Sequence, residues 1–274
     1  MRIVAVASTA IIVSVALAAP VVAFASRATR AVVLRKLSSG SVTATCPKGE
    51  HVAFGGLVGE FKAPPNAPRH PVVFAEGMRR TAPDRWTVSG QNGAPDTGSR
   101  LTAVAYCARG AVPVTASNTV AVAAHRNGSV TATCPAGTVV VGGGFDSGAS
   151  PQHLELMVRL DRPTSVQWRV VLRNIAATAT KITALAYCAA GPAPTVHTAT
   201  VKMGKNKGGT ARASCPANTS LVFGGLIANS PGAGHQAADL EAFSWTASST
   251  KQWVVTAFND GGSSGNLEAL AYCR

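Results

Sequence analysis

The strongest constraint on the fold is that the chain carries one sequence pattern three times. Segment Gly40–Pro47 reads Gly-Ser-Val-Thr-Ala-Thr-Cys-Pro, segment Gly128–Pro135 repeats these residues, and segment Gly209–Pro216 is a looser copy. Each copy continues through a Gly-Gly pair, a Trp and an Asn, and closes on Ala-Tyr-Cys. Self-similarity of this kind predicts an architecture of repeated structural units. We therefore expect three homologous units, each holding two of the six cysteines.

The spacing of the marked residues within a copy is nearly constant. The Gly-Gly pair follows the first Cys by nine and ten residues, and the Trp precedes the Asn by six. The copies of each position are Gly55–Gly56, Gly143–Gly144 and Gly224–Gly225, then Trp86, Trp168 and Trp253, then Asn92, Asn174 and Asn259. A valine two residues after each Trp puts an apolar neighbour on the same strand face. We predict core positions for the tryptophans, hydrogen bonding at turns or strand ends for the asparagines, and close strand approach or a bulge at the glycines.

The residues between these marks follow a strand pattern. In Trp168–Asn174, alternate residues place the Trp, a Val, a Leu and the Asn on one face and two arginines on the other. Val, Thr, Gly and Pro are frequent, and no long helical period occurs beyond the N-terminus. We predict an all-β protein of three homologous disulfide-bridged units with five or six strands each. The apolar faces around the closing tyrosines favour packing about a pseudo-threefold axis, either β-prism-like or as three packed small sandwiches.

A tight turn is expected before the first Cys of each copy, at Ser39–Gly40, Asn127–Gly128 and Gly208–Gly209. Asn-Gly and Gly-Gly suit a type I′ turn because both central residues take positive φ. The runs that precede them, such as Val114–Ala124, are then the partner strands of hairpins.

Residues 1–25 have the pattern of a secretory signal peptide. A single Arg2 precedes an apolar run, and Ala23-Phe24-Ala25 is a small-x-small cleavage motif. The alternative is an uncleaved membrane anchor, since the apolar run nearly reaches the ~20 residues that a span needs. The positive charges that follow the run oppose the positive-inside rule and favour cleavage. We predict a secreted protein whose units cover residues 26–110, 111–191 and 192–274.

Export makes disulfides expected. Two schemes respect the repeat and stay open on spacing alone. The first pairs cysteines within a copy, as Cys46–Cys107, Cys134–Cys188 and Cys215–Cys273. The second pairs them across copies, as Cys107–Cys134 and Cys188–Cys215, with Cys46–Cys273 closing the chain.

The chain is strongly basic, with a formal net charge of +13. One interpretation is a surface charge that only maintains solubility. The other is attraction to polyanions, above all an anionic cell-wall polymer or glycan. The modest basic clusters that serve as candidate binding residues are Arg79 and Arg80, and Lys202, Lys205 and Lys207. Because the basic residues are scattered and the aromatics few, sequence-specific nucleic-acid binding is not expected.

Motifs for catalysis or metal binding are poor. No Cys-x-x-Cys or His-Glu-x-x-His occurs, and the six histidines share no repeat position. Gly261-x-Ser263-x-Gly265 has the residue pattern of a nucleophile elbow. It falls between two expected strands, however, and not at a strand-to-helix turn. Asp239 and Glu241 share a strand face without equivalents in the other copies. We predict no catalytic residue, no metal, no cofactor and no enzymatic activity.

Three functions are therefore ranked. The first is a secreted, non-enzymatic binding or structural module at the cell surface that binds anionic polymers. The second is a lectin-like glycan binder, for which Trp245, unique to the third copy, is the candidate exposed aromatic contact. The third is a secreted hydrolase with a site in one unit.

The repeat resembles one found in secreted actinobacterial and phage-associated proteins. The matching residues are Cys46-Pro47-Lys48-Gly49 and Cys134-Pro135-Ala136-Gly137, the Gly and Trp positions, and the three Ala-Tyr-Cys ends. The third copy departs from the pattern at Asn218, where Gly is usual. Single copies of that repeat imply pairing of cysteines within a copy, and some follow collagen-like stalks, which implies a threefold arrangement. The resemblance carries no established activity and no catalytic residue.

Overall fold

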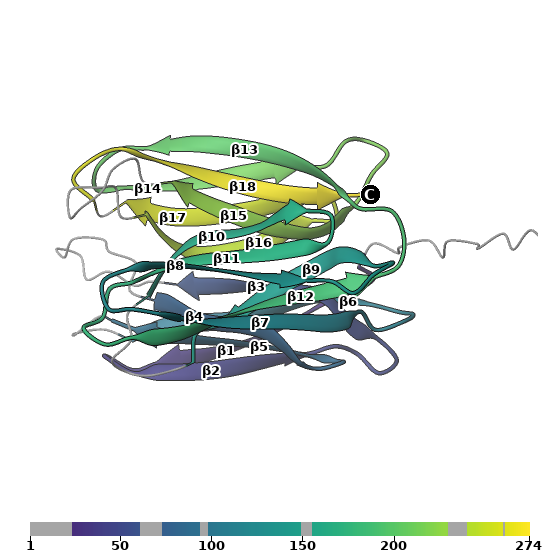
Figure 1. The fold of residues 1–274 in the computed structure, drawn as a ribbon, viewed down its shortest axis with the longest axis horizontal. Helices are drawn as coiled ribbons and strands as arrows, with labels where there is room; N and C mark the ends of the chain where they lie inside the picture. Colours follow the sequence, from purple (N-terminus) through teal and green to yellow (C-terminus); the bar gives the residue numbers. More distant parts are fainter. Residues whose placement is uncertain (1–23, 61–72, 94–97, 149–154, 230–239, 260) are drawn as a thin grey trace, which may run out of the picture.

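The computed structural model describes residues 24–60, 73–93, 98–148, 155–229, 240–259 and 261–274 (Figure 1). Within these residues the chain forms 18 strands and no helix, six strands in each repeat. The first unit holds β1 (Ser26–Leu34), β2 (Ser39–Thr45), β3 (His51–Glu60), β4 (Val73–Ala82), β5 (Arg85–Asn92) and β6 (Ser99–Ala108). The second holds β7 (Val114–Val122), β8 (Asn127–Thr133), β9 (Val139–Asp146), β10 (Glu155–Thr164), β11 (Gln167–Asn174) and β12 (Thr180–Ala189). The third holds β13 (Thr195–Met203), β14 (Lys207–Ser214), β15 (Leu221–Asn229), β16 (Leu240–Ser249), β17 (Gln252–Asn259) and β18 (Gly265–Cys273).

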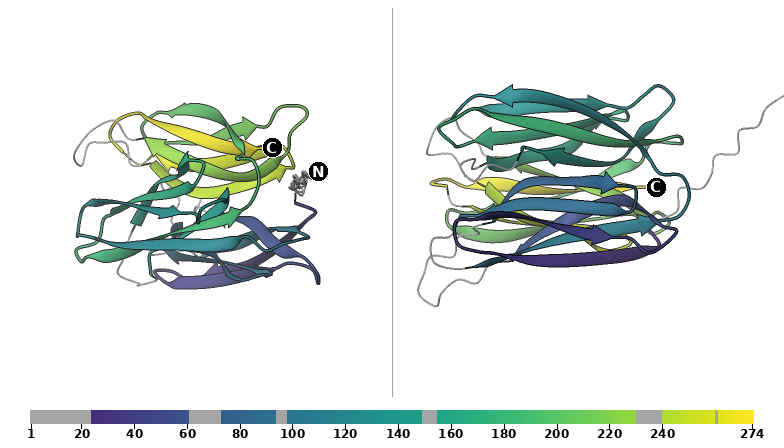
Figure 2. Two further views of the ribbon diagram at one scale, coloured as in Figure 1. Left: turned by 45° about the vertical axis from the view of Figure 1, so that its right-hand side comes forward. Right: turned by 90° about the horizontal axis from the view of Figure 1, so that it is seen from below.

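The strands form three six-stranded antiparallel sheets, and every sheet is shared by two units. The orders are β1-β6-β3-β16-β17-β14, β13-β18-β15-β10-β11-β8 and β2-β5-β4-β9-β12-β7. Each unit therefore contributes its first, sixth and third strands to one sheet and its second, fifth and fourth strands to another. The two half-sheets of a unit face each other as a small sandwich. The sharing brings β3 of the first unit beside β16 of the third, and Figure 2 gives two further views of this arrangement.

The third strand of one unit meets the fourth strand of another at each of three junctions. The pairs at these seams are β3 with β16, β9 with β4, and β15 with β10. The cycle closes because the last unit pairs back onto the first. The predicted fold class is confirmed, and the sandwiches are joined by continuous sheets about a pseudo-threefold axis.

One disulfide links the two half-sheets of each sandwich. The bonds are Cys46–Cys107, Cys134–Cys188 and Cys215–Cys273, with Cα–Cα distances of 5.7, 5.7 and 5.6 Å. Pairing within a copy is therefore correct and the cross-copy scheme is wrong. No cysteine of the chain is free. The bonds indicate that the protein matures in an oxidising environment.

The hairpin turns lie two or three residues earlier than the sequence predicts. At these turns the residues with positive φ are Leu37 (48°), His125 (56°) and Asn206 (51°), at equivalent places between the first two strands of each unit. Gly40 and Gly128 instead lie inside β2 and β8. A Cβ on Gly128 would lie 2.1 Å from Val122, and one on Gly40 would lie 2.7 Å from Leu34. Glycine is needed there for the close approach of the hairpin strands, not for a positive φ.

Candidate functional site

The repeated Trp fills the centre of each sandwich. Trp86, Trp168 and Trp253 are 0, 0 and 1% exposed. Each indole lies on the first glycine of the Gly-Gly pair, where a Cβ would come within 1.9 to 2.1 Å of the ring. Each Nε1 also donates to the carbonyl of the second glycine, at 3.0 to 3.2 Å. The indoles are thus structural and have no accessible face for a ligand.

The second glycine of each pair permits the contact between units. A Cβ on Gly56, Gly144 or Gly225 would lie 2.3 to 2.5 Å from a backbone carbonyl of the neighbouring unit's fourth strand. Backbone atoms cannot give way as a side-chain end can. The Gly-Gly pair therefore serves two contacts, one with the Trp of its own sandwich and one with the next unit.

The closing tyrosine of each unit reaches across the seam. Its hydroxyl accepts a hydrogen bond from a backbone amide of the neighbouring unit, at 2.7 to 2.9 Å. The pairs are Tyr187 with Arg80, Tyr272 with Arg162, and Tyr106 with Ala247. All three rings are at most 2% exposed. Burial raises the pKa of Tyr106 and of Tyr187 to about 12, so these hydroxyls stay neutral at ordinary pH.

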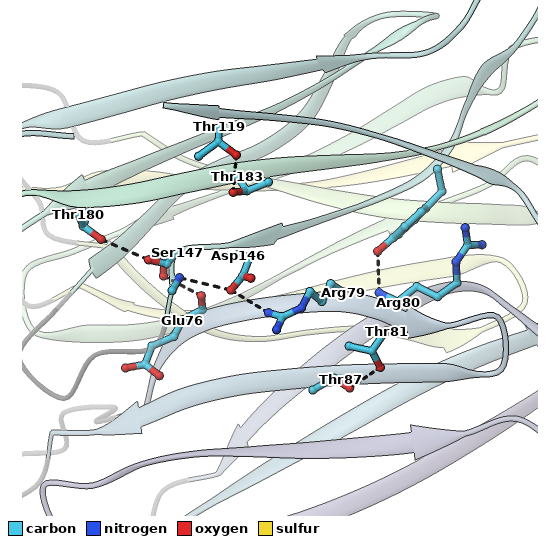
Figure 3. Close-up of polar contacts among 12 residues, drawn as sticks. Glu76, Arg79, Arg80, Thr81, Thr87, Thr119, Asp146, Ser147, Thr180 and Thr183 are labelled. Carbon is cyan, nitrogen blue, oxygen red and sulfur yellow. Dashed lines mark hydrogen bonds and ion pairs between the residues drawn. The ribbon is translucent and has the colours of Figure 1, made fainter. Parts of the chain in front are cut away.

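Arg80 belongs to this seam and is not an exposed binding residue. Its guanidinium lies 4.7 Å from the centre of the Tyr187 ring, and Nη2 donates to the Pro113 carbonyl and to the Thr115 hydroxyl. Burial lowers the pKa of Arg80, but the group stays charged because arginine does not deprotonate in proteins. The expectation that Arg80 is a free surface cation is therefore wrong. Figure 3 shows its amide at the β4–β9 seam.

Arg79 is tied to the same seam from the other side of the strand. It forms an ion pair of 2.8 Å with Asp146 on β9. Beside this pair, the Ser147 hydroxyl donates to the Glu76 carbonyl (Figure 3). Arg79 is thus a partly exposed cation whose charge is balanced by a carboxylate of the next unit.

Each repeated Asn holds the hairpin between the first two strands of its unit. The amides of Asn92, Asn174 and Asn259 are fully buried and donate to carbonyls at the end of the first strand. For Asn259 the acceptors are Met203 and Gly204, with a third bond to Ser263. These residues position the hairpins and do not face solvent.

Trp245 is buried, so the prediction of an exposed aromatic contact there is wrong. Its side chain is 1% exposed, and its Nε1 lies 3.0 Å from the sulfur of Met78 on the neighbouring unit. Met78, Leu160 and Trp245 occupy equivalent positions, each paired with the Val that follows the repeated Trp by two residues. Bulk at these positions fills the space where the units meet.

The three hairpins lie at one end of the molecule. Within the units, Leu34 pairs with Ser99, Val122 with Thr180, and Met203 with Gly265, so each hairpin lies beside the start of the sixth strand. At the seams the third and fourth strands pair antiparallel with little offset along their length. The hairpins of the three units therefore lie at the same end of the molecule. We call it the hairpin end; it is opposite the C-terminus in Figure 1. Its exposed basic residues are Arg35, Lys36, Arg100, Arg126, Lys181, Lys202, Lys205 and Lys207.

The described acidic side chains do not expose comparable negative charge. Asp161 lies in ion pairs with Arg159 and Arg169, and Glu76 is 2% exposed and accepts from the Ser39 hydroxyl. Glu241 is half-buried, and its predicted companion Asp239 lies outside the described residues. No group of His, Cys, Asp or Glu suited to a metal ion occurs among the residues that the structure describes. In the same part of the chain, no helix is long and apolar enough to cross a membrane.

Two sets of structural residues were missed from the sequence, although a signal for them exists. The first set, Met78, Leu160 and Trp245, precedes the repeated Trp by eight residues in every copy, and all three side chains are large and apolar. The residue six before the Trp is Arg80, Arg162 or Ala247, at the tyrosine contact. The predicted signal peptide also includes Phe24, which packs on Tyr106.

Comparison with protein-family models and with curated proteins finds no match for this chain. The resemblance to the actinobacterial and phage-associated repeat therefore stays a prediction.

Proposed function

We propose that the protein is a secreted, non-enzymatic module that binds anionic polymers of a cell surface through its hairpin end. The partner chemistry is a chain of phosphates or of other regularly spaced anions, as in anionic cell-wall polymers. The three disulfides support an extracellular setting.

One observation carries this proposal: the uneven exposure of charge. Among the described side chains, no Asp or Glu is exposed, whereas many Lys and Arg are. Two of the described carboxylates form ion pairs with arginines, Asp146 with Arg79 and Asp161 with Arg169. A surface with an excess of positive charge creates a field that attracts polyanions and speeds their association.

The hairpin end holds eight of these exposed cations. Lys202 is the penultimate residue of β13, Lys205 lies in the turn and Lys207 begins β14, and all three are exposed. The equivalent hairpins of the other units add Arg35 and Lys36, and Arg126, on the same end. Hairpins related by the pseudo-threefold axis give a polymer several basic contacts, which raises its apparent affinity without any new kind of contact.

Stacking of neutral sugars has less support. Among the described residues, no Trp, Tyr or Phe side chain is exposed, so no ring is presented as a platform. A hydrolase requires convergent carboxylates, and Asp161 and Asp146 are each committed to an ion pair.

The test is a salt titration of binding to long-chain inorganic polyphosphate, with neutral dextran as the comparison polymer. We expect binding to polyphosphate alone, with affinity that falls steeply between about 0.05 and 0.2 M salt because bound counterions are released. Substituting Lys202, Lys205 and Lys207 by Gln should lower the affinity and reduce the slope of log K against log salt by about three.

The matched control removes three charges from the opposite end. Lys48, Arg85 and Arg109 are exposed there, next to the turns that follow β2, β4 and β6. Substituting them by Gln gives the same net charge but should leave most of the affinity. Equal losses in the two triple variants would remove the hairpin end as the site, and no binding to polyphosphate at low salt would remove the function.

A further inference from the structure

The three tyrosine contacts between units are completed in two different ways. At two seams, an arginine of the neighbouring fourth strand covers the ring, Arg80 on Tyr187 at 4.7 Å and Arg162 on Tyr272 at 5.2 Å. At the third seam the equivalent residue is Ala247, whose amide still donates to the Tyr106 hydroxyl. A methyl group cannot cover the ring, and the guanidinium over this ring belongs to Arg27 on β1 of the same unit, farther away at 6.0 Å from the ring centre.

Phe24 covers Tyr106 at this third seam. The two ring centres lie 4.9 Å apart, and Phe24 also meets Phe54 edge-on at 5.6 Å. Ala25 continues the pairing of β1 by donating its amide to the Cys107 carbonyl at 2.7 Å. Phe24 and Ala25 are thus part of the folded first unit, although they precede β1.

Comparison with the other units indicates that the Phe24 contact takes the place of the fourth-strand arginine contact. Register on the sixth strand makes Val112 and Ala193 the counterparts of Phe24. Both counterparts are exposed, and arginine covers the tyrosine at their seams. Where the fourth-strand arginine is absent, the residue two before the first strand is aromatic. The two changes compensate each other within one chain.

This contact conflicts with cleavage after Ala25. The motif Ala23-Phe24-Ala25 would make Ser26 the first residue and would remove the ring that covers Tyr106. A cut two residues earlier keeps the ring: Ala23 then stands directly before the cut, and Val21 stands at the third position before it. We propose that the signal peptide is removed between Ala23 and Phe24. Phe24 is then the first residue of the mature protein and covers Tyr106 at the third seam.

The proposal rests on the export included in the proposed function and is independent of polymer binding. The direct test is the intact mass and N-terminal sequence of protein secreted by a bacterial host from the full chain. A first residue of Phe24 is the expected result. A first residue of Ser26, or retention of residues 1–23, would overturn the cleavage site. An N-terminus at Phe24 together with no polyphosphate binding would keep this proposal and remove the other.

The packing of Phe24 on Tyr106 has a separate test in protein that starts at Phe24. The variant Phe24→Ala replaces a half-buried aromatic at a packed seam and should lower Tm by about 5 °C for a chain of this size. The matched change Val112→Ala, at the exposed counterpart, should shift Tm by less than about 1 °C.

The decisive variant restores the arrangement of the other two seams. Adding Ala247→Arg to Phe24→Ala supplies a guanidinium for Tyr106 and should recover part of the lost Tm. Ala247→Arg alone should give no gain, because Phe24 already occupies the ring face. An unchanged Tm in Phe24→Ala, or no recovery in the double variant, would contradict the compensation.

Discussion

Trp168 lies so close to Gly143 that a Cβ on this glycine would be 2.1 Å from the indole. The indole Nε1 donates to the carbonyl of the next residue, Gly144, at 3.1 Å. The repeated Trp and the repeated Gly-Gly pair are therefore one structural element, although 24 residues separate the hydrogen-bonded atoms along the chain.

Gly143→Ala should destabilise the second unit strongly. The indole is fully buried and its hydrogen bond fixes its position, so the added methyl must displace backbone or ring. We expect the free energy of unfolding to fall by about 3 kcal/mol, the upper range of overpacking in a core. Gly208→Ala is the control, because the nearest atom to its Cβ is 3.8 Å away. Chemical denaturation measures both, and equal costs would contradict the role of the indole.

Tyr187→Phe should weaken the seam between the first two units. The substitution leaves the Arg80 amide without its acceptor, in a place where the ring is 1% exposed. A buried donor that loses its partner costs about 1–3 kcal/mol. Thr119→Val removes an exposed hydroxyl pair with Thr183 and should cost much less. A Tyr187→Phe protein as stable as the parent would show that the hydroxyl does not hold the seam.

Stability should decline at alkaline pH because of the same tyrosines. The pKa of Tyr106 and of Tyr187 is raised from 10.0 to about 12 in the folded protein. Between these values the unfolded chain has lost protons that the folded chain keeps, so the free energy of unfolding falls as pH rises. The contribution is fully present below pH 10.0 and lost as pH passes about 12. Denaturant midpoints measured across this range, together with tyrosinate absorbance, test the direction; tyrosine ionisation near its ordinary pKa in the folded state would contradict it.

The three disulfides should contribute similar amounts to stability. They close loops with sequence separations of 61, 54 and 58 residues. The chain-entropy model gives about 4 kcal/mol for each. Replacing both cysteines of one bond by serine, in three separate variants, should therefore give comparable falls in the free energy of unfolding. A cost confined to one variant would show that local packing, and not loop closure, sets the contribution.

The repeat made much of this fold predictable. Two cysteines per copy, alternating apolar residues and a fixed Trp-to-Asn spacing led to three strand-rich bridged units. The sharing of sheets was not predictable, because pairing of β3 with β16 joins segments that are far apart in sequence and whose strand patterns match many partners equally well.

Burial of single residues was predicted less well, for a physical reason. Trp245 has no repeat equivalent of its own type, so it resembled an added surface aromatic; only the seam shows that it shares a position with Met78 and Leu160. The prediction of a surface cation at Arg80 fails because a local sequence does not reveal that Tyr187 of another unit lies under it. Contacts between repeats decide both cases.

The neighbours Arg79 and Arg80 provide the sharpest contrast in charge. Arg79→Gln breaks an ion pair with Asp146 whose two side chains are 36 and 31% exposed, and such pairs contribute about 0–1 kcal/mol. Arg80→Gln removes the guanidinium from the Tyr187 ring and two hydrogen bonds that join β4 to the start of β7. A desolvated cation over an aromatic ring contributes up to about 2 kcal/mol before hydrogen bonds are counted. Arg80→Gln should therefore cost clearly more stability than Arg79→Gln, although both remove one charge.

Thermal unfolding of the two single variants, with polyphosphate affinity measured on each, separates structure from binding. We expect a lower Tm for Arg80→Gln and nearly equal, small changes in affinity for both, because neither side chain lies at the hairpin end. If Arg80→Gln left Tm unchanged and instead weakened polyphosphate binding, Arg80 would be a surface contact after all, and its stacking on Tyr187 would not hold the two units together.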